Sequence, residues 1–186
     1  MSKFIDVSHE VEHGMVTYRG LPAPVVSEHL SREASRGLYA EGTEFFIGKI
    51  EMVANTGTYL DAPFHRFADG QDLAGLSLSS LADLAGLTVR AGEEGSRAVE
   101  ASAFEGLDVR GKAVLVRTGW SRHWRTERYF EGHPFLTEGA ARHLAEVGAA
   151  LVGIDSYNID DTADASGPAH TILLPGGIPI LEDPLR

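Results

Sequence analysis

The chain has 186 residues, 43% hydrophobic and 23% charged, a composition typical of one globular domain with a sizeable core. Its 16 basic and 27 acidic side chains give a formal net charge of −11, which argues against nucleic acid or an anionic membrane surface as a partner. The absence of cysteine excludes disulfides and thiolate catalysis. Because no apolar run approaches the roughly 20 residues that span a bilayer, and the start lacks a signal peptide's apolar core, we expect a single cytoplasmic domain over residues 1–186.

The first third of the chain is predicted to contain two strands. Residues 4–9 are expected to form a short first strand, and residues 43–54 alternate well enough for a long one. The polar stretch between residues 22 and 42 is difficult to assign, and its middle resembles a surface loop.

A polar segment follows the long strand. If residues 51–61 are extended, the period-two alternation of side chains places three polar residues on one face, with Gly57 leaving space beside them: Asn55, Tyr59 and Asp61. Pro63 cannot extend a central ladder, so the strand should end near Asp61, and His65 should follow on a turn. Polar groups that converge at a strand end often form an active site. A solvated strand edge followed by an ordinary turn is the alternative.

Short elements are predicted in the middle of the chain. Residues 79–84 and 99–107 resemble short helices, and residues 87–91 and 113–118 resemble strands, the second buried because it is rich in Val and Leu. Trp120 follows the second strand, where it could reach a pocket or pack in the core.

A strand–helix–strand unit is predicted next. Thr137 suits a helix N-cap, the following residues repeat at helical spacing, and Gly148 suits the residue that closes the helix. Residues 149–155 then read as a buried strand. This order after the strand at 113–118 predicts parallel pairing.

Two candidate ligands, His170 and Glu182, lie near the C-terminus. In a strand over residues 178–182, Glu182 would share an otherwise apolar face, where a carboxylate needs a partner, a proton or a metal. Alternatively, Glu182 lies beyond the strand in water. His123 and His133 are expected to be solvated or hydrogen-bonded loop residues.

The segment 55–65 resembles the signature His-x-Gly-Thr-His-x-Asp-x-Pro-x-His of the cyclase family, which includes bacterial kynurenine formamidase and isatin hydrolase. Five positions match, and Asn55 and Tyr59 stand where the family has histidines. Further matches, which extend the resemblance over most of the chain, lie at residues 6–9, 14–20, 118–121 and 153–160.

The resemblance implies an α/β protein of the swivelling β/β/α fold, with a central mixed β-barrel-like sheet and flanking helices, assembled as a homodimer or homotetramer. It also implies a small-molecule pocket lined by the aromatic side chain of Tyr18. We add Asn55 and Trp120 as candidate substrate-binding residues.

In the family, two divalent metals share one aspartate. Asp61, His170 and Glu182 match one ligand set completely, whereas the other set becomes Asn55, Tyr59 and Asp61. Asparagine offers a neutral oxygen, and tyrosine binds metal well only as phenolate, against a reference pKa of about 10. We therefore expect one divalent metal, zinc or manganese, held by Asp61, His170 and Glu182; a metal-free form is the alternative.

His65 matches the family's acid/base residue, and an imidazole can take and return a proton near neutral pH. The first hypothesis is a hydrolase that opens or cleaves a small amide, imide, lactam or lactone, with Tyr59 donating to the developing oxyanion. The second is a metal-independent cyclase, isomerase or dehydratase of secondary metabolism that uses Tyr59, Asp61 and His65. The third is a non-catalytic binding homologue. Metal analysis would discriminate among them.

Overall fold

The computed structural model describes residues 6–91 and 96–184. Its contacts divide the chain into two compact units, one of residues 1–9 with 58–186 and one of residues 10–57, so the expectation of a single domain stays a prediction. No helix in the described ranges is long and apolar enough to cross a membrane.

The strands are β1 Val25–Leu30, β2 Ile47–Glu51, β3 Tyr59–Asp61, β4 Gly86–Arg90, β5 Ala98–Val99, β6 Ala113–Arg117, β7 Phe135–Leu136, β8 Leu151–Ile154 and β9 Ile180–Glu182. The α-helices are α1 Arg32–Ser35, α2 Glu138–Val147 and α3 Pro168–Leu173, and the 3-10 helices are η1 Pro63–His65, η2 Leu78–Ser80, η3 Ala101–Phe104, η4 Trp120–His123, η5 Glu127–Phe130 and η6 Leu174–Gly176.

A mixed sheet forms the centre of the larger unit. Its strand order among the described residues is β3-β9-β8-β6-β4, in which β4, β6, β8 and β9 run parallel and β3 pairs with β9 antiparallel. The predicted α/β class with a mixed central sheet is therefore confirmed. Barrel-like closure and the swivelling β/β/α arrangement stay predictions.

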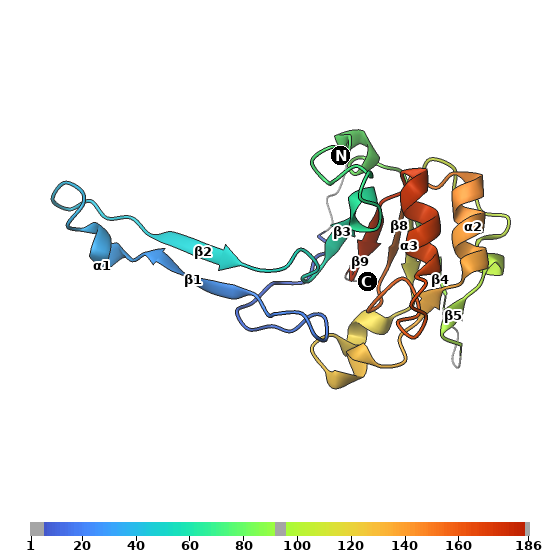
Figure 1. Cartoon of the computed structure of the whole chain (residues 1–186), viewed down its shortest axis with the longest axis horizontal. Helices are drawn as coiled ribbons and strands as arrows, with labels where there is room; N and C mark the ends of the chain where they lie inside the picture. The colour runs from blue at the N-terminus through green and yellow to red at the C-terminus, as the bar shows by residue number, and fades with distance from the viewer. Residues whose placement is uncertain (1–5, 92–95, 185–186) are drawn as a thin grey trace. The chain divides into compact units, whose positions relative to one another are not determined.

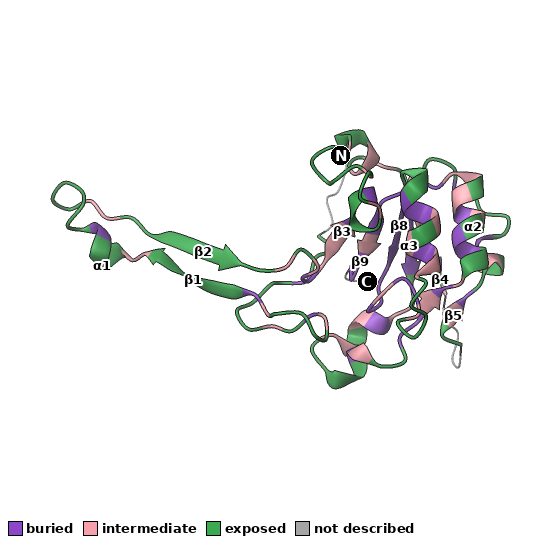
Figure 2. Ribbon diagram, viewed as in Figure 1, coloured by how far each residue is buried: buried purple, intermediate pink, exposed green. Residues whose placement is uncertain are grey.

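Helices α2 and α3 pack side by side on one face of this sheet (Figure 1). The Thr137 side chain accepts a hydrogen bond from the amide of Ala140, and Gly148 ends α2 in the left-handed conformation, as the sequence predicted. The strand–helix–strand prediction is confirmed as well, because β6 and β8 are parallel neighbours on either side of α2 in the sequence. The core lies between the helices and the sheet, where Val116, Ile154 and Ile180 are almost fully buried (Figure 2).

Several predicted elements are shorter than expected. Residues 6–9 form no strand, and residues 4 and 5 lie outside the described ranges. The continuous strand expected up to Asp61 is interrupted, because β2 ends at Glu51 and β3 begins only at Tyr59. Between them Thr56 folds the chain back, with its hydroxyl donating to the carbonyl of Val53. The helices expected at 79–84 and 99–107 are the 3-10 turns η2 and η3.

The smaller unit is built on a hairpin. Strands β1 and β2 pair antiparallel from Val25 opposite Glu51 to Leu30 opposite Ile47, and α1 lies in their connection. All residues of the two strands are exposed except Leu30, which is half-buried (Figure 2). Within the same unit, the Thr17 hydroxyl donates to the carbonyl of Asn55 and accepts from the amide of Gly57.

Candidate functional site

The short ladder between β3 and β9 brings three predicted site residues together. Tyr59 lies opposite Glu182, and Asp61 lies opposite Ile180. Paired residues point to the same face of a sheet, and so do residues two apart in one strand. Because Ile180 packs in the core beneath the helices, Tyr59, Asp61 and Glu182 lie on the face that α3 covers.

Helix α3 adds His170 to this group. The Nε2 atom of His170 lies 3.5 Å from Oδ2 of Asp61 and 3.8 Å from Oε1 of Glu182. The side chain of Glu182 is fully buried, so the alternative of a solvated glutamate beyond the strand end is wrong. His170 therefore lies close to both Asp61 and Glu182, as the predicted set requires.

His65 ends the 3-10 turn η1, which follows β3 as the proline predicted. Its Nδ1 atom is 3.4 Å from Oδ1 of Asp61, and its side chain is 43% exposed. Asp61, His65 and His170 each offer one ligand atom, and these atoms lie within 4.8 Å of one another. This trio shares two members with the predicted set and differs in the third, which was predicted to be Glu182.

Two of the candidate ligands are held by further groups. Oδ2 of Asp160 lies 2.5 Å from Nδ1 of His170, which leaves the Nε2 atom directed at Asp61. Asp160 also accepts hydrogen bonds from the backbone N–H groups of Ala169 and His170, so it fixes the start of α3. Glu182 accepts two hydrogen bonds. The backbone N–H of Ile159 donates to Oε1 at 2.8 Å, and the hydroxyl of Tyr59 donates to Oε2. A metal-ligating histidine commonly donates its other ring nitrogen to a carboxylate in this way.

The buried groups shift one another's pKa values. Burial raises the pKa of Glu182, while the charge of His170 opposes that shift. Burial would lower the pKa of His170, but the hydrogen bond with Asp160 and the nearby carboxylates of Asp61 and Glu182 outweigh it and raise the pKa to about 10. Burial and the nearby charges of Glu182, Asp183 and Asp61 raise the pKa of Tyr59 well above its usual value.

The donor set fits a divalent metal. Oδ2 of Asp61 is buried and has no hydrogen-bond partner among the described residues. A buried carboxylate in that state needs a proton or a cation, and either the protonated imidazole of His170 or a metal ion can supply that charge. Ligands at about 2.1 Å from a tetrahedral ion are roughly 3.4 Å apart, which is close to the 3.5 Å between Asp61 and His170. Two carboxylates and an imidazole are ligands that suit zinc or manganese.

The three residues predicted to bind substrate lie in different surroundings. Tyr18 is half-buried and Asn55 lies in a bend, and both belong to the unit of residues 10–57. Trp120 is 6% exposed, and its Nε1 donates to the carbonyl of Tyr129 at 3.0 Å, which is the core packing considered as its alternative role. Contact of any of the three with a substrate stays a prediction.

Sequence reasoning assigned no role to two buried residues. Asp160 lies in a segment that matches the family, but nothing in its spacing indicated the bond to His170. His133 was expected to be solvated or hydrogen-bonded, yet it is 1% exposed, and neither ring nitrogen has a partner in the part of the chain that the structure describes. Its ring lies 5.3 Å from that of Tyr157, which lies outside the loop of His133, so no local signal in the sequence indicated this contact.

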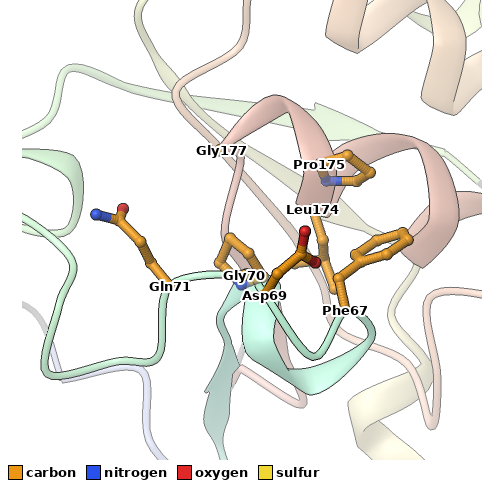
Figure 3. A pocket seen from close by; sticks show the side chains of 8 residues that line it. Phe67, Asp69, Gly70, Gln71, Leu174, Pro175 and Gly177 are labelled. Atoms are coloured by element: carbon orange, nitrogen blue, oxygen red, sulfur yellow. The ribbon is translucent and has the colours of Figure 1, made fainter.

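A separate pocket of about 410 Å³ adjoins the elements that carry His65 and His170 (Figure 3). Its walls come from Pro63 at the start of η1, from the loop after η1, and from η6 with Gly177, and they include the side chains of Phe67, Asp69 and Leu174. None of the predicted site residues lines it. The pocket is therefore distinct from the cluster around Asp61.

Comparison with known proteins identifies the family. The model of the family described as "Putative cyclase" matches residues 5–161. A kynurenine formamidase of Bacillus cereus is 30% identical over 184 residues, which cover 98% of this chain and 82% of that protein. A kynurenine formamidase of Bacillus anthracis is 30% identical over 189 residues, with the same coverage. The chain therefore belongs to the cyclase family, and these relatives are named as enzymes.

Solved structures show the same fold. An isatin hydrolase bound to the product analogue thioisatinate aligns with a TM-score of 0.76 and 17% identity, over 98% of this chain and 79% of that one. A potential metal-dependent hydrolase with cyclase activity aligns with a TM-score of 0.75 and 24% identity, over 97% and 80%. The arrangement of elements around the site is thus one that known structures share.

Proposed function

We propose that this protein is a metal-dependent hydrolase that cleaves or opens a small amide, imide, lactam or lactone. The observation that carries the proposal is the buried Oδ2 of Asp61, which lacks a hydrogen bond among the described residues and faces Nε2 of His170. The names of the kynurenine formamidase and isatin hydrolase relatives support the reaction class.

Asp61, His170 and Glu182 would hold one zinc or manganese ion. We choose Glu182 over His65 as the third ligand because Glu182 is a fully buried carboxylate whose Oε1 lies 3.8 Å from Nε2 of His170, whereas the His65 side chain is 43% exposed. When bound there, a divalent ion supplies Lewis acidity, which polarises a carbonyl and makes water more acidic.

His65 would move the protons of the reaction. Its position beside Asp61 and its access to solvent suit a group that accepts a proton from the attacking water. The same imidazole then delivers that proton to the leaving nitrogen or oxygen. Asp160 keeps His170 in the orientation that leaves Nε2 available, and the Glu182 side chain is fully buried.

Metal removal tests the proposal. Purified protein should carry about one zinc or manganese ion per chain, measured by elemental analysis, and should hydrolyse members of a panel of aryl formamides, cyclic imides and lactones. Dialysis against a chelator should abolish turnover, and the metal should restore it. Turnover that persists at full rate in the metal-free protein would instead support the metal-independent cyclase, isomerase or dehydratase.

The hairpin supports self-association into a homodimer or homotetramer. An isolated two-stranded hairpin is at best marginally stable in water. Between residues 25 and 52, nine large apolar side chains are 43–68% exposed: Val25, Val26, Leu38, Tyr39, Phe45, Phe46, Ile47, Ile50 and Met52. A second copy of the chain offers an identical apolar hairpin that can cover this surface. The cytoplasmic location stays a prediction.

Ile50 offers a test of this assembly, because it is 68% exposed. Changing Ile50 to lysine should shift the molar mass measured by light scattering toward that of the monomer, since a charge would be buried in the contact. The matched control is Leu78→Lys, which alters an apolar residue that is 78% exposed outside the hairpin. A monomeric wild-type protein, or equal loss of mass in both variants, would contradict the assignment of the hairpin as the contact.

A further inference from the structure

The hydroxyl of Tyr59 is already engaged within the site. Tyr59 and Glu182 are directly paired across β3 and β9, and the Tyr59 hydroxyl donates to Oε2 of Glu182. A phenol has one O–H donor. If that donor is committed to Glu182, it is not free for the oxyanion of a substrate, which was the role that the sequence suggested.

The bond to Tyr59 completes a two-point support of Glu182. The amide of Ile159 donates to Oε1, and the phenol of Tyr59 donates to Oε2. The two donors approach different oxygens from different elements, so together they restrict rotation of the carboxylate about its last bond. The result is that Oε1 stays 3.8 Å from Nε2 of His170.

His170 is supported in a similar way. Asp160 holds its Nδ1 atom, so that Nε2 faces Asp61 and Glu182. Oδ2 of Asp61, in contrast, has no such partner in the described ranges. Oδ2 of Asp61 is thus without a hydrogen bond within the described part of the chain, whereas His170 and Glu182 are each held in place by residues outside the proposed ligand set. Outer groups of this kind typically contribute 10- to 100-fold to metal affinity.

We propose that Tyr59 is a positioning residue, which holds Glu182 in the orientation of a metal ligand, rather than a donor to the substrate. This inference rests on the proposed function, because it assumes a metal at Asp61, His170 and Glu182. It predicts that loss of the phenol hydroxyl weakens metal binding even when no substrate is present.

The chain contains a close control for this hydroxyl. Tyr129 donates its O–H to Asp183, the residue next to Glu182, and both partners are almost fully buried. The chemistry of the two pairs is the same, but Asp183 is not among the candidate ligands. Tyr129→Phe therefore reproduces the loss of a buried phenol–carboxylate bond without touching a ligand of the proposed metal.

The experiment measures Co²⁺ binding to Tyr59→Phe, Tyr129→Phe and the wild-type protein, by competition with a chromophoric chelator and by the visible spectrum of the bound ion. Tyr59→Phe should weaken Co²⁺ affinity by about 10- to 100-fold and alter the spectrum, whereas Tyr129→Phe should change the affinity by less than about 3-fold. Asp160→Asn, which acts on His170 independently, should weaken binding by a similar factor. Near-UV circular dichroism confirms that each variant is folded, and hydrolysis is followed with the same panel of compounds.

Three results would overturn the proposal. If Tyr59→Phe keeps the wild-type affinity and spectrum but loses kcat, Tyr59 is an oxyanion donor, and the hydrolase proposal stands without the positioning role. If Tyr129→Phe weakens binding as much as Tyr59→Phe does, the effect is a general loss of stability. If the wild-type protein binds no Co²⁺, zinc or manganese, the metal-dependent hydrolase and the positioning role both fail.

Discussion

Replacing Asp61 with asparagine is expected to abolish metal binding and to lower turnover by a factor on the order of 10³ or more. Asp61 is the residue that both histidines approach, with His65 at 3.4 Å from one oxygen and His170 at 3.5 Å from the other. Asparagine keeps the shape of the side chain but removes its charge. The loss of metal binding should therefore result from the loss of charge alone. Elemental analysis should show a lower metal content, and kinetics should show a lower kcat/KM.

The fold should survive this change. Asparagine has the size and shape of aspartate, and the carboxylates of Asp160 and Glu182 remain beside His170 after the change. Thermal unfolding of the metal-free variant should therefore occur within a few degrees of that of the metal-free parent. The matched control is Asp69→Asn, which removes an exposed carboxylate from the loop after η1 and should leave metal binding and turnover unchanged. A variant at Asp61 that keeps its metal would exclude Asp61 as a ligand.

The second large effect is expected for His65→Ala, which should lower turnover by about 10²- to 10⁴-fold while the metal remains bound. The imidazole lies beside Asp61, but three other side chains make up the proposed ligand set. Because the His65 side chain is 43% exposed, its removal should change the free energy of unfolding by less than about 0.5 kcal/mol. Steady-state kinetics, elemental analysis and thermal unfolding of one preparation measure all three effects.

The metal content separates two roles of His65. If His65→Ala loses its metal together with its turnover, His65 is the third ligand and Glu182 is not, in keeping with the close approach of Asp61, His65 and His170. If neither property changes, His65 has no part in the reaction. The control is His143→Ala, on the outer helix α2, which should leave turnover unchanged.

The elements that the sequence predicted well are those with strong local signals. Thr137 and Gly148 delimit α2 because a hydroxyl cap and a left-handed glycine act within one helical turn. The apolar runs that became β6 and β8 were recognisable for a similar reason, since a buried parallel strand is apolar on both faces. The convergence of Asp61 with His170 and Glu182 came from resemblance, because no local signal relates residues so far apart.

The predicted strand beyond Glu51 was wrong because two local signals in the sequence competed there. Alternation continues past Glu51, but Thr56 bonds back to Val53 and Gly57 adopts a positive φ of 67°, so the chain turns instead of extending. The same break removes Asn55 from the strand face on which it was expected. His133 shows the other limit, because its burial depends on aromatic neighbours such as Tyr157 that only the tertiary fold brings together.

The three-residue pairing of β3 with β9 has a consequence for how the proposed metal ion would be acquired. Asp61 and Glu182 belong to strands separated by most of the larger unit, and only this pairing brings them to a common face. A nascent chain on the ribosome would therefore hold an incomplete set of the proposed ligands until β9 has emerged. Capture of the proposed ion would then follow the synthesis of β9, and a chain that stalls before β9 docks should be unable to retain the ion.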